Sequence, residues 1–203
     1  MNMNKINSKN KSKYDIYAIW LYNELKRNQK PSSYYFITIT FKKNSVNRQR
    51  RSTEGCPESE FEFDGFNLLY NRVCRKFIGR NYQRHYNQIN LPTVIACIDV
   101  EGTRFGKSPV EIENKHIHSV WKIPSDNQEA FEKFIKGYKL KTDLKNMIDS
   151  DGFDIQNINP SDLKNVVTYS PKFLKFNVTD MRVEEDLRIY PYKPMDLPLE
   201  VHN

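Results

Sequence analysis

Alternation of polar and apolar residues over Tyr34–Phe41 is the feature that most constrains the fold. β-branched and aromatic residues dominate this segment, as is typical of strands. Successive side chains of a strand point to opposite sides of the sheet, so the segment would have two distinct faces. One face would carry Phe36, Thr38 and Thr40, and the other Ile37, Ile39 and Phe41.

The rest of the chain shows further strand and helix patterns. Strands are predicted over Thr93–Glu101, Glu113–Ile123 and Phe153–Ile158, and the first two should pair as a hairpin or close neighbours. Helices are predicted over 14–29, from an Asp64 cap through Phe77, over 126–138, and from Leu163 through Phe173. This order predicts an α+β fold with a central antiparallel sheet flanked by helices.

The 203 residues fit one domain with tails. Residues 1–13 are rich in Asn, Lys and Ser and are predicted to be a disordered basic tail, and residues 14–176 would form the domain. Residues 177–203 contain several prolines and are predicted to be an extended tail. Residues 42–62 are predicted to form an unusually long loop, which suggests a functional or mobile segment.

Composition favours a protein of a reducing compartment. No apolar run approaches the ~20 residues that would span a bilayer, and the first residues do not resemble a secretory signal. The three cysteines are odd in number and match no zinc pattern, which favours free thiols. We therefore expect the cytoplasm or nucleoid, with no membrane association.

The positive charge is concentrated in the first part of the chain. Residues 1–90 contain 17 Lys and Arg against 7 Asp and Glu, whereas residues 91–203 contain 15 against 18. A basic half joined to a mildly acidic half is compatible with a polyanion at one surface and a cation at another. The candidates for phosphate contacts are Lys42, Lys43, Arg48, Arg50, Arg51, Arg72, Arg75, Lys76 and Arg80.

The sequence His116-Ile117-His118 predicts a metal site. Residues two apart in a strand face the same way, so both imidazoles would point to one side and could share a divalent cation. A carboxylate is needed as third ligand, and Glu101, at the end of the preceding strand, is preferred. Asp99, Glu111 and Glu113 remain alternatives. Two histidines and one carboxylate would leave positions on Mg²⁺ or Mn²⁺ open for phosphate oxygens.

A candidate nucleophile lies in Tyr169-Ser170-Pro171-Lys172. Residues three apart share one face of a helix, so Lys172 would lie near the Tyr169 hydroxyl. An ammonium group favours the phenolate form of a tyrosine, whose pKa is ordinarily about 10. Pro171 argues for a bend directly after Tyr169 or for a later start of the helix, because a proline inside a helix removes a hydrogen bond.

In this order, Phe36–Phe41, the histidine pair and the Tyr169–Lys172 segment resemble the three motifs of HUH-superfamily rolling-circle replication initiators (Rep endonucleases) of the single-tyrosine, bacterial plasmid and phage type. The segment 71–80 is also similar to the helix that follows their first motif. The resemblance covers roughly residues 34–176 and implies the family's fold, an antiparallel sheet of the RRM or ferredoxin-like type with flanking helices.

The resemblance also implies roles for individual residues. His116 and His118 match the metal-binding pair, Glu101 its acidic partner, Tyr169 the nucleophile and Lys172 the accompanying lysine. The implied activity is site-specific nicking and joining of single-stranded or hairpin DNA through a 5′-phosphotyrosine, which initiates rolling-circle replication. The sequence contains no GxxxxGK[ST] phosphate loop and no other sign of a nucleotide cofactor, so a host helicase and polymerase would be required.

Three alternatives remain open. A single-tyrosine transposase has the same order of histidine pair and tyrosine, whereas relaxases place the tyrosine first. A non-cutting DNA-binding protein of the same fold would need no nucleophile. A cupin-type metal enzyme also uses two histidines one residue apart, but it needs a further histidine on a later strand, and the only one downstream is His202.

Overall fold

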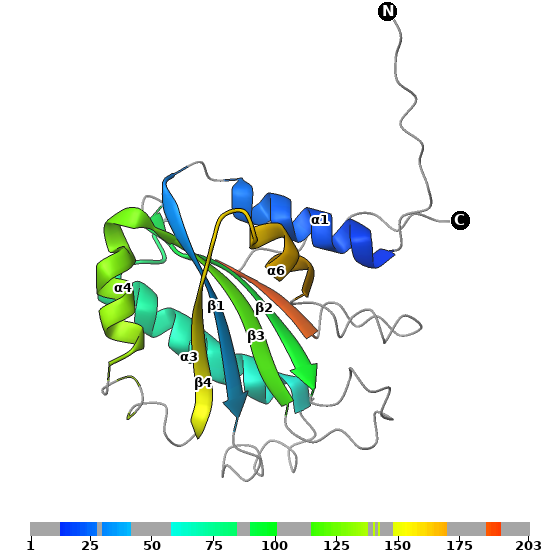
Figure 1. Ribbon diagram of the computed structural model, residues 1–203. Coiled ribbons are helices and arrows are strands. Elements are labelled where there is room, and N and C mark those ends of the chain that lie inside the picture. Colours follow the sequence, from blue (N-terminus) through cyan, green and yellow to red (C-terminus); the bar gives the residue numbers. More distant parts are fainter. Residues whose placement is uncertain are drawn as a thin grey trace, which may run out of the picture.

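The computed structural model has an antiparallel sheet of five strands with helices on both faces, an α+β fold (Figure 1). The structure describes residues 13–27, 30–41, 58–84, 90–100, 115–137, 140, 142, 148–169 and 186–191. The strands are β1 (Ser32–Phe41), β2 (Thr93–Val100), β3 (Lys115–Pro124), β4 (Ile148–Ile158) and β5 (Leu187–Tyr190). The helices are α1 (Lys13–Lys26), α3 (Glu58–Phe77), the short 3₁₀ helix η4 (Ser125–Asn127), α4 (Gln128–Ile135) and α6 (Leu163–Tyr169).

The strands lie in the order β4-β1-β3-β2-β5, and all four neighbouring pairs are antiparallel. The predicted pairing of the second and third strands is confirmed, since β2 runs antiparallel to β3 along its whole length. β3 is the central strand, between β1 and β2. A side chain on β3 therefore has a cross-strand partner on either side.

Helices α3 and α4 cover one face of the sheet. Ile37 and Ile39 of β1 and Ile117 of β3 are buried on this face, together with the aromatic side chains of the two helices. The ring of Trp121 packs between Phe66, at 5.7 Å, and Phe131, also at 5.7 Å. This layer supplies the larger of the two apolar cores.

Helices α1 and α6 cover the other face, where they lie against each other (Figure 1). Leu21 and Leu25 of α1 and Leu163 and Val167 of α6 form one buried cluster with sheet residues. The buried Lys122 of β3 donates a hydrogen bond of 2.8 Å from Nζ to the carbonyl oxygen of Leu25. A lysine at this point satisfies a carbonyl near the C-terminal end of α1 and ties the helix to the central strand.

The start of one helix differs from the sequence-based expectation. Helix α3 begins at Glu58, so the predicted loop 42–62 is shorter and Asp64 lies inside the helix instead of capping it. Phe63, one turn before the predicted buried face begins at Phe66, is itself buried and extends that face. Helix α6 ends at Tyr169, and its predicted continuation to Phe173 lies outside the described residues.

Strand β5 corrects the prediction that residues 177–203 form only an extended tail. Leu187–Tyr190 pair antiparallel with β2, with Cys97 opposite Leu187 and Val94 opposite Tyr190. Leu187 is fully buried, and Tyr190 packs against Phe66 and Tyr70. The last strand of the sheet therefore lies beyond the predicted end of the domain, whereas most of the remaining residues of 177–203 are outside the described part.

The cysteines that the structure describes are free thiols, as the sequence predicted, and both are buried. Cys74 and Cys97 are free, and burial raises the pKa of the Cys74 thiol to about 12. Burial, followed by the charges of Asp99 and Asp186, also raises the pKa of Cys97. Cys56 lies outside the described residues. Among the helices in the described part of the chain, none combines the length and apolar character that crossing a membrane requires.

The role of β5 can be tested with Leu187→Ala. We expect this variant to lose about 2–5 kcal/mol of unfolding free energy, because the substitution leaves a cavity at a fully buried position. Ile19→Ala, at an exposed aliphatic side chain of α1, is the control and should change stability by no more than about 0.5 kcal/mol. The measurement is urea unfolding followed by circular dichroism. Equal stability of Leu187→Ala and the wild type would contradict the packing of β5 on the sheet.

Candidate metal centre

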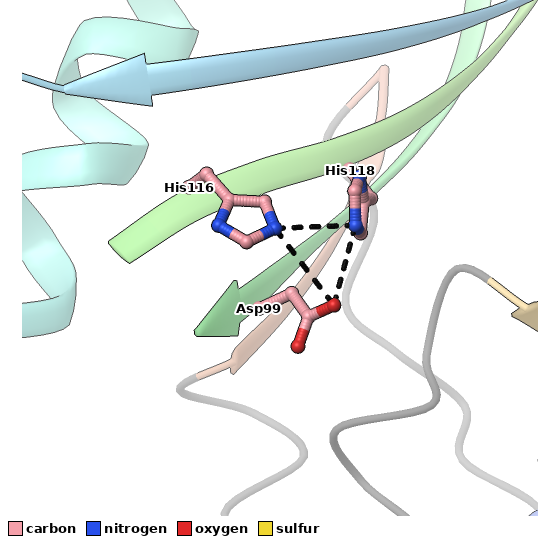
Figure 2. A group of neighbouring side chains, drawn as sticks. All are labelled: Asp99, His116 and His118. Carbon is pink, nitrogen blue, oxygen red and sulfur yellow. Dashed lines mark hydrogen bonds and ion pairs between the residues drawn. The ribbon is translucent and has the colours of Figure 1, made fainter. Parts of the chain in front are cut away.

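The register between β2 and β3 brings three metal-ligating side chains together. Asp99 is the cross-strand partner of His116, and His118 lies two residues further along β3, on the same face. Figure 2 shows the two imidazole rings and the carboxylate pointing toward one another from the two strands. Ile117, between the histidines, points to the other face and is fully buried in the core beneath α3.

The three ligand atoms are close to one another and shielded from solvent. His118 Nε2 lies 3.2 Å from His116 Nε2 and 3.2 Å from Asp99 Oδ2, and His116 Nε2 lies 3.8 Å from the same oxygen. The Asp99 side chain is fully buried, and those of His118 and His116 are 9% and 17% exposed. This group could hold a metal ion, with His116 on the more open side.

The spacing of these atoms fits one cation. The distances of 3.2–3.8 Å between these atoms would allow all three to bind one cation at about 2.0–2.2 Å, the range typical of metal–nitrogen and metal–oxygen bonds. Two neutral imidazoles and one carboxylate would supply three ligands to such a cation. Its remaining coordination positions could be filled by oxygen atoms of a substrate.

Two residues of β1 contact the ring of His118. Thr38, its cross-strand partner, has Oγ1 at 3.0 Å from His118 Nδ1. The ring of Phe36 stacks on the imidazole, with centroids 5.1 Å apart and planes inclined by 30°. The sequence predicts both on one face of a strand but does not connect them with the histidines. That connection depends on the pairing of β1 with β3, which no local sequence pattern indicates.

The predicted nucleophile lies beside the same histidine. Tyr169, the last residue of α6, has its ring centroid 5.8 Å from that of His118 and 6.3 Å from that of Phe36. Its side chain is 36% exposed, so the phenol borders both His118 and solvent. Residues far apart in sequence are thus brought together where α6 meets the sheet.

Several predicted site residues lie outside the described part of the chain. They are Glu101, Lys172 and the basic loop residues Lys42, Lys43, Arg48, Arg50 and Arg51. Of the four carboxylates considered as third ligand, the described residues include only Asp99, which the sequence analysis ranked below Glu101. Asp99 lies directly opposite His116, so even a short side chain reaches the ring nitrogens.

The remaining basic candidates lie on the other layer of the molecule. Arg72, Arg75 and Lys76 belong to α3, whose buried face covers the side of the sheet away from the histidines, and Arg80 follows this helix. Arg75, Lys76 and Arg80 are exposed. The structure therefore does not bring these residues to the candidate metal centre.

Comparison with protein-family profiles, with curated proteins and with solved structures finds no match for the chain.

Metal binding by this group can be tested with Asp99→Asn. Removal of a residue that only hydrogen-bonds a metal ligand typically weakens metal binding by about 10–100-fold. Removal of the charge of a direct ligand such as Asp99 should weaken Mn²⁺ binding by more than this. Isothermal titration with Mn²⁺ is the measurement. Asp154→Asn, at an exposed carboxylate opposite Thr38 on the same sheet face, is the matched control and should bind like the wild type. Unchanged affinity in Asp99→Asn together with a loss in Glu101→Gln would assign the third ligand to Glu101 instead.

Proposed function

We propose that the protein is a metal-dependent endonuclease that nicks and rejoins single-stranded DNA through a covalent bond to Tyr169. The observation that carries the proposal is the position of the Tyr169 ring, 5.8 Å from the ring of His118 and partly open to solvent. A tyrosine nucleophile needs a neighbouring group that activates the phosphate, and a cation bound by Asp99, His116 and His118 would lie close to this phenol.

The reaction would be a transfer of the phosphoryl group from one oxygen to another. The Tyr169 oxygen attacks phosphorus, and the bond from phosphorus to the 3′ oxygen breaks. The products are a free 3′-hydroxyl and a 5′-phosphotyrosine, and the reverse attack by a 3′-hydroxyl rejoins the strand. Lys172, three residues after Tyr169, would favour the phenolate and oppose the negative charge of the transition state.

A divalent cation bound at the site would supply Lewis acidity and hold the scissile phosphate in line with the tyrosine. The donor set suits Mn²⁺, since imidazole nitrogen is a poorer ligand for Mg²⁺, which prefers oxygen. Single-stranded or hairpin DNA is the substrate that we infer, because stacking in a duplex would shield the target linkage. Initiation of rolling-circle replication in a bacterial cytoplasm, with a host helicase and polymerase, is the cellular role that this chemistry would serve.

Covalent capture of DNA tests the proposal. With Mn²⁺ and a library of labelled single-stranded oligonucleotides, the wild-type protein should form an adduct that survives a denaturing gel. Tyr169→Phe should abolish the adduct, because the substitution removes only the nucleophilic oxygen. Tyr22→Phe, on α1 at the same side of the sheet, is the matched control and should form the adduct normally.

Other outcomes separate the alternatives. Binding of DNA without any adduct, unaffected by Tyr169→Phe, would identify a non-cutting DNA-binding protein and overturn the proposal. Paired cleavage at the two ends of an element, instead of cleavage at one origin, would favour a single-tyrosine transposase.

The two groups of basic residues should differ in their effect on short substrates. The segment that begins with Lys42 and Lys43 follows the end of β1, where Thr40 lies opposite His116, whereas Arg75 and Lys76 lie on the opposite layer. We expect Lys42→Ala/Lys43→Ala to weaken binding of a short single-stranded oligonucleotide and to reduce the slope of log affinity against log salt by about 0.7 for each lost phosphate contact.

Arg75→Ala/Lys76→Ala is the matched double variant and should leave binding and cleavage of the same oligonucleotide unchanged. Fluorescence anisotropy at several salt concentrations measures both effects. A larger loss in the α3 variant than in the Lys42/Lys43 variant would contradict this assignment of the substrate path.

A further inference from the structure

The imidazole of His118 is held on three sides. Its Nδ1 lies 3.0 Å from Thr38 Oγ1, its Nε2 lies 3.2 Å from Asp99 Oδ2, and one ring face stacks on Phe36. The His116 side chain, by comparison, is nearly twice as exposed. The two histidines of the pair are therefore not equivalent, and His118 is the more constrained one.

The contact with Thr38 has a consequence for the proton of the His118 ring. A neutral imidazole carries one proton, and only the unprotonated nitrogen can bind a cation. Nε2 is the nitrogen that faces Asp99 and His116, so a metal-binding His118 must carry its proton on Nδ1. In that state Nδ1 donates a hydrogen bond to Thr38 Oγ1, which accepts it.

The backbone around Thr38 favours a fixed position of this hydroxyl. Strand β1 is paired on both sides, and Thr38 lies opposite His118 on β3 and opposite Asp154 on β4. The side chain is β-branched, and branching at Cβ restricts rotation about χ1. A hydroxyl held in this way favours one orientation of the ring, and it can accept the Nδ1 proton once a cation occupies the Nε2 side.

We propose that Thr38 is a positioning residue that holds His118 in the Nδ1-protonated, metal-binding tautomer. The proposal rests on the metal site of the proposed function. It adds that His118, one of the two histidine ligands, is already oriented for binding by Thr38. Contacts of this kind to a metal-binding histidine are typically worth a factor of about 10–100 in metal affinity. The hydroxyl of a strand residue would thus set how tightly the cation is bound.

Three variants of β1 test the proposal by Mn²⁺ titration. Thr38→Val keeps the branched shape and removes the acceptor, and it should weaken Mn²⁺ binding by about 10-fold or more. Thr38→Ser retains a hydroxyl and should restore most of the affinity. Thr40→Val is the matched control, because it removes a threonine hydroxyl from the same face of the same strand, opposite His116, and it should bind within about threefold of the wild type.

The tautomer itself gives a second readout, taken on protein saturated with the diamagnetic cation Zn²⁺. Long-range proton–nitrogen correlation spectra of ¹⁵N-histidine-labelled protein should show His118, identified by its absence in His118→Gln, with its proton on Nδ1. Thr38→Val at the same Zn²⁺ concentration should show a mixture of tautomers. This measurement also decides the case if Thr38→Val does not fold, because a wild-type His118 protonated on Nε2 would overturn the proposal.

The outcomes separate this proposal from the proposed function. Wild-type affinity in Thr38→Val, or equal losses in Thr38→Val and Thr38→Ser, would overturn the role of the hydroxyl while leaving metal-dependent nicking intact. A wild-type protein that binds Mn²⁺ with the expected dependence on Thr38 but forms no DNA adduct would support Thr38 and overturn the nicking activity. If the wild type does not bind Mn²⁺, both the metal site and the role of Thr38 in metal binding are wrong.

Discussion

The antiparallel register of β2 against β3 is the constraint on which the candidate site depends. It places Asp99 directly opposite His116 and leaves His118 on the same face, so that three ligand atoms converge within 3.8 Å. A shift of the pairing by one residue would turn the side chains of one strand to the other face. The carboxylate would then lie in the apolar core, where an isolated charge is strongly unfavourable.

The apolar layer beneath the sheet keeps this register in place. Ile117 alternates with the two histidines and is fully buried with Ile39 of β1 and Ile98 of β2, its cross-strand partners. Any slip of β3 would expose this side chain and others that pack on α3 and α4. The face that carries the polar ligands is therefore stabilised by the burial of the residues that lie between them.

Local sequence patterns were sufficient for the fold class and for the histidine pair, since periods of two and of three to four residues determine which side chains share a face. They were insufficient wherever the answer depended on a partner strand. The contact between Thr38 and His118 requires that β1 lie next to β3. Local patterns alone favour Glu101 over Asp99 because they do not give the register of β2 against β3, which places Asp99 opposite His116. The four residues of β5 are too few to show a clear alternation of polar and apolar side chains. The prolines that follow them favour the interpretation as an extended tail. The early start of α3 was missed because Asp64 resembles a cap.

The candidate metal ligands and Tyr169 are held in place by different parts of the fold. The ligand atoms belong to two inner strands, whereas Tyr169 is the last residue of a seven-residue helix that packs on α1 through Leu163 and Val167. Loosening of that small helical contact would change the distance between the Tyr169 phenol and the three candidate ligands without breaking any strand pairing. In a protein built this way, the position of the phenol and the arrangement of the candidate ligands can be adjusted separately, by substitutions in different layers.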